Sequence, residues 1–372
     1  YKLMSKFDSI RPYDDSEVSF ILNRLVKNKD LQNLFISSSP ILSKLSNLPL
    51  INFIAGQLLK NKAKNIRTIS DYQDVFKNIV DEVISNTIKN FTVEGLDFIN
   101  VNKSYLFISN HRDITLDSAL LNYTLHKNNL KTTNNAVGNN LLEESWASDL
   151  MRLNKSFIID RSGKSKRAIY DSLNTASAFI QDRILNKNES IWIAQKQGRS
   201  KDGLDETDPS VLKMIHLQSR KSNTIAEALN TLSVIPVAIS YEYDPNDILK
   251  AKEVFAINNG MQYSKVKGED LRSISDGITQ EKGDVFLSIG QQIKFEGESY
   301  SDCAEKISES INLLYKNHST NYVADILLKN KKIDAKDIDK HYLNAYLYLQ
   351  KRMSNIPVEM HDTFLKQYSN SL

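Results

Sequence analysis

The chain has 372 residues, of which 41% are hydrophobic and 25% are charged, and its formal net charge is +3. This composition is typical of a globular protein with one large domain and additions, or with two domains. The slight excess of positive charge gives no support for nucleic-acid binding, although it allows a basic patch that faces an anionic surface. The single cysteine, Cys303, excludes an intrachain disulfide and a cysteine-based zinc site, so we expect an intracellular protein.

Residues 1–90 form a predicted N-terminal helical region, because their apolar residues recur at helical spacing. No run of eighteen apolar residues occurs, so we expect no membrane-spanning helix. Residues 41–59 are apolar but are interrupted by Pro49. They fit either an amphipathic segment in a membrane interface or a helix hairpin packed on the main domain. A third helix begins near Ile69, and its apolar stripe, which reaches Ile88, is predicted to pack in the core.

From Phe91 onward, short apolar runs alternate with helical patterns, which is typical of an α/β domain. We expect a mixed, mostly parallel sheet flanked by helices over residues 91–330, and a C-terminal helical extension over residues 331–372. The predicted strands are 91–94, 105–109, 132–137, 156–159, 190–194, 232–240 and 284–289. The predicted helices are 115–128, 164–185 and 304–315. Pro236 indicates that the strand at 232–240 lies at a sheet edge or ends there.

A polar cluster follows the predicted strand 105–109, where the next helix begins. It comprises Asn110, His111, Arg112, Asp113 and Asp117. Ligands and catalytic groups gather beyond the carboxyl ends of strands in open α/β sheets. A histidine held there by one of two nearby aspartates can take a proton from an alcohol near neutral pH. The alternative is that the Asn and Asp residues cap the helix and that the histidine is incidental.

Two basic clusters follow later strands. The first comprises Asp160, Arg161, Lys164, Lys166 and Arg167, and the second comprises Lys196, Gln197, Gly198, Arg199 and Lys201. Basic residues at the start of a helix, together with its free N–H groups, can bind an anion, although a solvated basic turn is the alternative. An arginine beside flexible backbone in the second cluster can bind phosphate through two hydrogen bonds.

Taken together, these clusters resemble the four ordered motifs of the glycerolipid acyltransferase superfamily, which includes the lysophosphatidate acyltransferases. The four matching stretches are Asn110-His111…Asp117, Phe157-Ile158-Ile159-Asp160-Arg161, Gln197-Gly198-Arg199-Ser200 and Val234-Ile235-Pro236-Val237. The resemblance covers roughly residues 91–295 and leaves both ends of the chain unexplained.

The sequence departs from the family pattern in two places. Asp117 stands one residue further from His111 than the family spacing, which we interpret as a one-residue bulge in the turn. Gln197 replaces the family's glutamate, and Arg199 follows Gly198 without an intervening threonine. We therefore expect a more electropositive site, in which Arg199 and its lysine neighbours keep their charges without the family's carboxylate among them.

The resemblance implies a glycerol-phosphate acyltransferase-like fold and direct O-acyl transfer from acyl-CoA or acyl carrier protein. The acceptor would be a lysoglycerophospholipid, 1-acylglycerol 3-phosphate first, and His111 with Asp117 would be the catalytic pair. The implied substrate-binding residues are Asn110, Arg112, Asp160, Arg161, Lys164, Gln197, Gly198, Arg199 and Lys201. No metal and no cofactor other than the acyl donor are expected. Membrane association would be peripheral, at the cytoplasmic face of the inner or plasma membrane.

Three alternatives remain. The acceptor could be another membrane lipid, such as an aminolipid. An esterase or phosphatase could use the same pair, although the chain lacks a Gly-x-Ser-x-Gly motif. A catalytically inactive lipid-binding homologue would be consistent with Gln197.

Overall fold

The computed structural model describes residues 6–38, 50–139, 145–266, 268–297 and 299–372. The chain divides into two compact units, one of residues 1–79 with 134–179 and the other of residues 80–133 with 180–372. Two of the three dividing points fall within the helices α4 (Ile69–Thr87) and α7 (Lys166–Lys187), and the third falls between residues 133 and 134. The predicted domain boundaries at residues 90 and 330 stay a prediction.

The first unit is mainly helical. Besides the first part of α4 and most of α7, it contains α1 (Asp15–Leu25), α2 (Lys29–Ser38), α3 (Ile51–Ala63), β3 (Asn134–Gly138), α6 (Ser145–Leu153) and β4 (Ser156–Ile159). Asp14 and Glu17 start α1 with a capping box. The apolar face of α1 packs against Trp146 and Leu153 of α6. The predicted N-terminal helical region is therefore confirmed.

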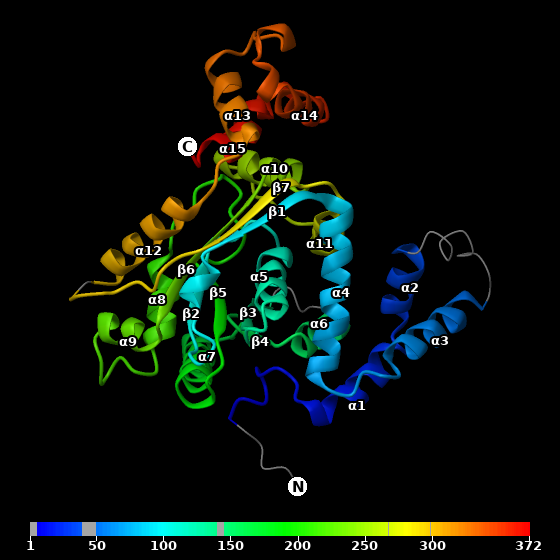
Figure 1. Ribbon diagram of the computed structural model, residues 1–372, viewed down its shortest axis with the longest axis vertical. Coiled ribbons are helices and arrows are strands. Elements are labelled where there is room, and N and C mark those ends of the chain that lie inside the picture. Colours follow the sequence, from blue (N-terminus) through cyan, green and yellow to red (C-terminus); the bar gives the residue numbers. More distant parts are fainter. Residues whose placement is uncertain (1–5, 39–49, 140–144, 267, 298) are drawn as a thin grey trace. The chain divides into compact units, whose positions relative to one another are not determined.

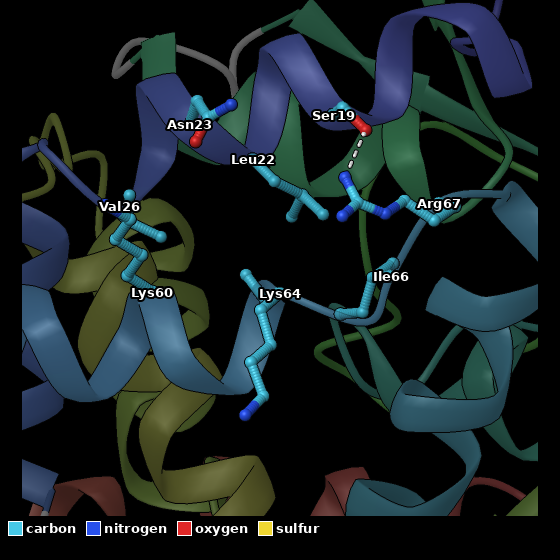
Figure 2. A pocket seen from close by; sticks show the side chains of 9 residues that line it. Ser19, Leu22, Asn23, Val26, Lys60, Lys64, Ile66 and Arg67 are labelled. Atoms are coloured by element: carbon cyan, nitrogen blue, oxygen red, sulfur yellow. Dashed lines mark hydrogen bonds between the residues drawn. The ribbon is translucent and has the colours of Figure 1, made fainter.

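The part of the first unit between α1 and α3 contains a pocket of about 180 Å³ (Figure 2). Its lining residues are Ser19, Leu22, Asn23, Val26, Lys60, Ala63, Lys64, Ile66 and Arg67. Arg67 donates a hydrogen bond of 3.4 Å to the hydroxyl of Ser19 across it. Among the described residues, no helix has both the length and the apolar character that crossing a bilayer requires.

The structure tests the predicted apolar segment 41–59 only in part, and it contradicts part of the prediction for α4. Residues 41–49 of the predicted apolar segment lie outside the described residues, and residues 51–59 belong to α3. The prediction that the whole stripe of α4 is core is wrong, because Val75 and Ile79 are 41% and 48% exposed. The stripe is buried further along, at Val80 and Val83. Ile88, which we assigned to the same stripe, instead begins β1.

The second unit contains a sheet whose strands lie in the order β1 (Ile88–Glu94), β7 (Gly283–Ile289), β6 (Val234–Tyr241), β2 (Leu106–Ser109) and β5 (Ile191–Ala194). Only β6 and β7 are antiparallel in this unit, and β3 and β4 of the first unit are parallel. The predicted mixed, mostly parallel sheet flanked by helices is confirmed for the described residues.

Helices cover both faces of this sheet (Figure 1). The helices of the second unit are α5 (Leu116–Lys127), α8 (Pro209–His216), α9 (Ile225–Thr231), α10 (Asp247–Asn258), α11 (Glu269–Thr279), α12 (Tyr300–Leu314), α13 (Ser319–Lys329), α14 (Leu343–Met353) and α15 (His361–Ser369). Short 3-10 helices lie at Leu96–Phe98, Ala335–Asp337, Lys340–Tyr342 and Val358–Met360. The C-terminal helices α13 to α15 share one apolar cluster with Ala251 of α10.

The strand with the central proline is not at a sheet edge. β6 lies between β7 and β2, and seven of its eight residues are buried. Pro236 has no N–H to donate, but its carbonyl accepts a hydrogen bond from Gly290, just beyond the end of β7. The regular ladder between the two strands begins one residue later, at Val237. Pro236 is tolerated because the ladder to β7 has ended at its position, which the sequence pattern could not show.

Candidate active site

Asn110 fixes the start of the turn between β2 and α5. Its side chain is fully buried. Its amide oxygen accepts a hydrogen bond of 2.8 Å from the backbone N–H of Ile239, and its amide nitrogen donates one of 3.0 Å to the carbonyl of the same residue. The nitrogen also donates to Asp205 at 2.9 Å. Both amide N–H groups are therefore used within the protein, and they join the end of β2 to β6.

The imidazole of His111 meets the carboxylate of Asp117 in this turn. The distance from Nδ1 to Oδ2 is 2.8 Å, and the two side chains are 12% and 1% exposed. The same oxygen accepts hydrogen bonds from the backbone N–H groups of Arg112 and Asp113, at 2.7 and 3.0 Å. The turn thus folds around one buried carboxylate, and this geometry accommodates the longer spacing between the histidine and the aspartate.

Asp113 has a different place in the turn. Its Oδ1 accepts hydrogen bonds from the backbone N–H groups of Thr115 and Leu116, at 3.0 and 2.9 Å, at the start of α5. These are the contacts of a helix-capping side chain. Burial, and then the charge of Asp117, raises the pKa of the Asp113 carboxyl. The cluster therefore contains both structures that we considered, a capping aspartate and a histidine–aspartate pair.

Tyr241 and Trp192, which no motif included, complete the surroundings of the pair. Tyr241, at the end of β6, donates its hydroxyl to Oδ1 of Asp117 at 2.8 Å. Burial, and then the charge of Asp117, raises the pKa of Tyr241 well above its ordinary value, so the hydroxyl stays protonated. Trp192 lies edge-on to His111, with ring centroids 5.8 Å apart. Because β2 and β6 are parallel, the rule on strand ends could have identified Tyr241.

The second ring nitrogen of His111, Nε2, has no hydrogen-bond partner within the described ranges. When Nδ1–H donates to Asp117, Nε2 carries the lone pair of the neutral imidazole. It is therefore the atom at this site that can accept a proton from a hydroxyl group.

Arg112, which follows the histidine, directs its guanidinium into the protein. It pairs with Asp205 at 2.5 Å, donates to the carbonyl of Gly203 at 3.2 Å, and lies 4.9 Å from the ring centre of Tyr315. Its Nε is buried and has no hydrogen-bond partner in the described part of the chain. These contacts use the charge of Arg112 within the fold, and its predicted role in substrate binding stays a prediction.

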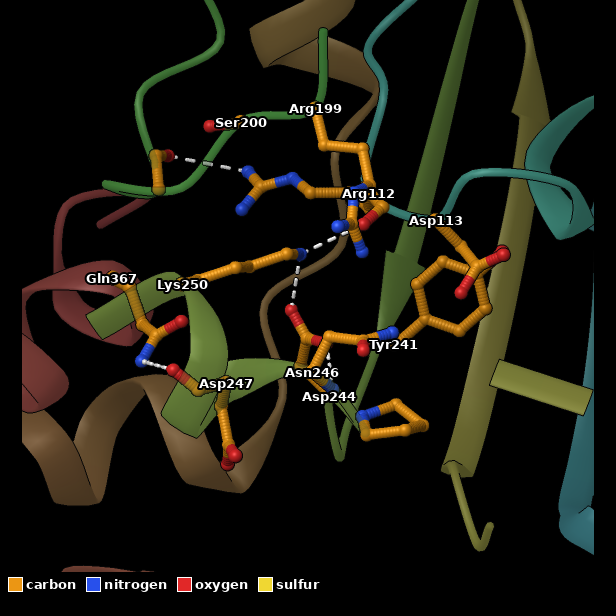
Figure 3. A network of polar contacts seen from close by, with 12 residues as sticks. Arg112, Asp113, Arg199, Ser200, Tyr241, Asp244, Asn246, Asp247, Lys250 and Gln367 are labelled. Atoms are coloured by element: carbon orange, nitrogen blue, oxygen red, sulfur yellow. Dashed lines mark hydrogen bonds and ion pairs between the residues drawn. The ribbon is translucent and has the colours of Figure 1, made fainter. Parts of the chain in front are cut away.

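Arg199 lies on the loop that follows β5 and returns to the histidine turn. The N–H of the next residue, Ser200, donates to the carbonyl of His111 at 2.7 Å. Arg199 itself makes one long hydrogen bond, 3.5 Å to the hydroxyl of Ser273, while its Nη1 is buried without a partner. In the part of the chain that the structure describes, it forms no ion pair with an acid. Figure 3 shows its guanidinium beside Arg112.

The neighbours of Arg199 differ from it in their contacts. Gln197 and Gly198 are exposed, and Gly198 has a φ of +77°, a conformation that favours glycine. Lys201 forms an ion pair with Glu253 of α10. Lys201 therefore has a carboxylate beside it that α10 supplies from a distant part of the sequence, although it is not the family's glutamate.

The remaining predicted residues, Asp160, Arg161 and Lys164, belong to the first unit. Asp160 accepts hydrogen bonds of 2.8 and 2.7 Å from the backbone and hydroxyl of Ser162, and one of 2.7 Å from Asn139. Lys164 is exposed, two residues before the start of α7. That these residues act together with His111 stays a prediction.

Part of the chain is similar to a known protein family. Residues 90–240 match a family model described as Acyltransferase. Among solved structures, the chain is similar to the 1-acyl-sn-glycerophosphate acyltransferase of Thermotoga maritima, with 14% sequence identity and a TM-score of 0.38. That similarity covers 78% of this chain and 92% of the other. No curated protein matches the sequence.

Proposed function

Because residues 90–240 form an acyltransferase domain of the glycerolipid acyltransferase superfamily, we propose that the chain moves a fatty acyl group from a thioester donor to the hydroxyl of a lysoglycerophospholipid. The proposed first acceptor is 1-acylglycerol 3-phosphate, and the donor is acyl-CoA or acyl carrier protein. The observation that carries this proposal is the contact of 2.8 Å between Nδ1 of His111 and Asp117, while Nε2 has no partner among the residues that the structure describes.

The proposed chemistry is a single acyl transfer without an acyl-enzyme. Nε2 of His111 takes the proton of the acceptor hydroxyl, while Asp117 holds the ring and stabilises the positive charge that it gains. The hydroxyl oxygen forms a C–O bond with the thioester carbonyl carbon, and the C–S bond then breaks. The thiolate leaves and takes the proton from the imidazolium. Cys303 is buried and has no part in this scheme.

The anionic acceptor is proposed because Arg199 forms no ion pair with an acid among the described residues. Its side chain is half-buried, and its buried Nη1 has no partner among these residues, which suits it to bind a phosphate group through two hydrogen bonds. This arrangement favours lysophosphatidate over a zwitterionic acceptor. An aminolipid acceptor is the second candidate. Gln197 can still accept a hydrogen bond from its amine or hydroxyl, although an amide lacks the negative charge that would attract an ammonium group.

The proposal is tested by following thiol release from acyl-CoA and from acyl carrier protein with a panel of acceptors. We expect release that depends on acceptor, and its loss in His111→Ala by about 10²- to 10⁴-fold, the usual contribution of a general base. Turnover of His111→Ala above about one percent of wild type would exclude that role. Release without any acylated product would identify a thioesterase, and no release with any donor would favour an inactive lipid-binding homologue.

A further inference from the structure

Lys250 of α10 reaches the turn that carries His111. Its Nζ donates a hydrogen bond of 2.7 Å to the carbonyl of Arg112, the residue that follows the histidine. It also pairs with Asp244 (Figure 3), and its side chain is only 3% exposed. Burying an ammonium group is costly unless it is paired and hydrogen-bonded, and both conditions hold here. No sequence motif pointed to this lysine.

Both backbone groups of Arg112, its N–H and its carbonyl, form hydrogen bonds with buried charged side chains. Its N–H donates to the carboxylate of Asp117 at 2.7 Å, and its carbonyl accepts from Lys250. Two buried charged groups from different elements therefore fix the peptide next to His111. A shift of this peptide would move the imidazole relative to any substrate, and small displacements of a reacting group lower the rate strongly.

The helix that carries Lys250 is itself held by the C-terminal helices. Asp247, in the first position of α10, is fully buried and pairs with Arg352 of α14. It also accepts hydrogen bonds from the hydroxyls of Tyr368 at 2.7 Å and Tyr348 at 3.2 Å. Ala251 and the apolar residues of α13, α14 and α15 form one cluster beneath these contacts. In Figure 1 these helices lie beside α10.

The C-terminal helices also contact the loop that carries Arg199. Gly203 has a φ of +84°, and a Cβ there would lie 2.3 Å from the carbonyl oxygen of Gln367. Asn370 donates to the carbonyl of Asp202 at 2.8 Å. The same α15 therefore contacts both α10, through a 3.0 Å bond from Gln367 to the Asp247 carbonyl, and the loop after β5.

We propose that Lys250 is a positioning residue for His111, and that the helices α13 to α15 hold it in place through Asp247. The inference rests on the proposed acyl transfer by His111. It assigns part of the reaction's requirements to residues outside the matched domain of residues 90–240. It also explains why a lysine, with its cost of burial, stands at this position instead of an apolar residue.

The first test is Lys250→Met, which keeps the length of the side chain and removes its hydrogen-bond donors. We expect kcat to fall by about 10- to 100-fold with little change in the KM of donor and acceptor. We also expect faster amide hydrogen exchange in residues 110–117. The matched control is Lys329→Met, because Lys329 is an exposed lysine of α13 paired only with Asp325, and we expect it to leave both readouts unchanged.

The second test acts from the far side of α10. Tyr368→Phe keeps the ring but removes the hydroxyl's bond of 2.7 Å to Asp247 and its long contact of 3.4 Å with the N–H of Asp244, and we expect a smaller fall in kcat with the same sign. Tyr322→Phe is its control, because Tyr322 is 43% exposed on α13. This pair keeps the proposal testable if Lys250→Met does not fold.

Three results would overturn the inference. The first is an unchanged kcat and unchanged exchange in the turn. The second is a selective rise in the KM of anionic acceptors at constant kcat, which would make Lys250 an acceptor-binding residue. The third is a lower Tm with normal turnover by the folded enzyme. If the wild type transfers no acyl group, the proposed function fails, whereas the exchange measurement still tests the positioning.

Discussion

The hydroxyl of Tyr241 lies 2.8 Å from Oδ1 of Asp117, while Oδ2 of the same carboxylate meets His111. The aspartate therefore receives a neutral donor on one oxygen and the imidazole on the other. β6 supplies the tyrosine and the turn after β2 supplies the histidine, so the parallel pairing of these strands sets the geometry of all three side chains.

The first prediction concerns the tyrosine. Tyr241→Phe should lower kcat/KM by about tenfold, because a hydrogen bond to a charged group is worth about 1.5–3 kcal/mol. Without this donor, the Asp117 carboxylate keeps fewer contacts and holds the His111 ring less firmly, so the loss should appear mainly in kcat. Tyr243→Phe is the control, because Tyr243 stacks on Tyr348 with ring centroids 4.1 Å apart. An unchanged kcat/KM in Tyr241→Phe would mean that Tyr241 serves only packing.

The second prediction separates the two aspartates. Asp117→Asn should reduce kcat by about 10²-fold or more, because it removes the charge that stabilises the imidazolium. Asp113→Asn should cost little, because asparagine is as good a helix cap as aspartate. The measurement is kcat for both variants, with circular dichroism as the check on folding. If Asp113→Asn were the slower enzyme, the assignment of the pair would be wrong.

The third prediction is a pH dependence of stability that originates at His318. Burial lowers the pKa of His318 from 6.5 to about 4 in the folded protein. The unfolded chain therefore binds a proton below pH 6.5 that the folded chain does not accept until about pH 4. The contribution of His318 to the free energy of unfolding is fully present above pH 6.5 and is lost as the pH falls toward 4. The loss is about 3 kcal/mol for this difference of about 2.5 in pKa.

Urea denaturation at pH 7 and pH 5 measures this effect. His318→Gln should be less sensitive to pH than the wild type between these values, although it loses packing against Phe286 at every pH. His341→Gln serves as the control, because His341 is exposed. Equal pH dependence in wild type and His318→Gln would exclude His318 as the source.

Residue patterns were sufficient to predict a mixed, mostly parallel sheet and to identify the motif residues, but not to predict the contacts between distant elements. The strands were found because β2 and β6 are continuous apolar runs, as expected for strands buried on both faces. The sheet-edge position that we expected from Pro236 was wrong, because a proline is tolerated in β6 only where its ladder to β7 has ended. Lys250 could not be identified from the sequence, since the carbonyl that it contacts lies 138 residues away. Tyr241 could have been identified from the sequence, because it directly follows the predicted strand 232–240 and functional groups gather at strand ends.

The fourth prediction concerns peripheral membrane association through α3. Phe53, Ile54 and Leu58 of this helix are 65%, 42% and 39% exposed, and Lys60, Lys62 and Lys64 follow them. An exposed apolar patch beside basic residues is suited to the interface of an anionic membrane. Phe53→Ser with Leu58→Ser should weaken binding to anionic liposomes. Leu313→Ser, at a residue 87% exposed on α12, should not.

High salt or carbonate should release the wild-type protein from membranes. Release only by detergent would indicate deeper insertion than this prediction allows. No binding to liposomes at all would favour the alternative in which the N-terminal helices pack only on the rest of the protein.

The last prediction is about the acceptor, and it depends on the difference between Arg199 and Lys201. Nη1 of Arg199 is buried and has no partner within the described ranges, whereas Lys201 is paired with Glu253. If Arg199 binds the acceptor phosphate, Arg199→Gln should raise the KM of lysophosphatidate by about 30-fold or more, because losing one partner of a desolvated charge contact costs about 2–5 kcal/mol. Lys201→Gln, the matched control on the same loop, should change this KM by less than about threefold.

Gln197→Glu places a carboxylate on an exposed side chain next to this site, so it should alter the KM of the acceptor more than that of the donor. Acyl transfer to lysophosphatidate, glycerol 3-phosphate and a lyso-aminolipid, measured for wild type and the three variants, decides the matter. If the wild type prefers an uncharged or zwitterionic acceptor, or if Arg199→Gln and Lys201→Gln behave alike, Arg199 does not bind phosphate and the enzyme acylates another lipid.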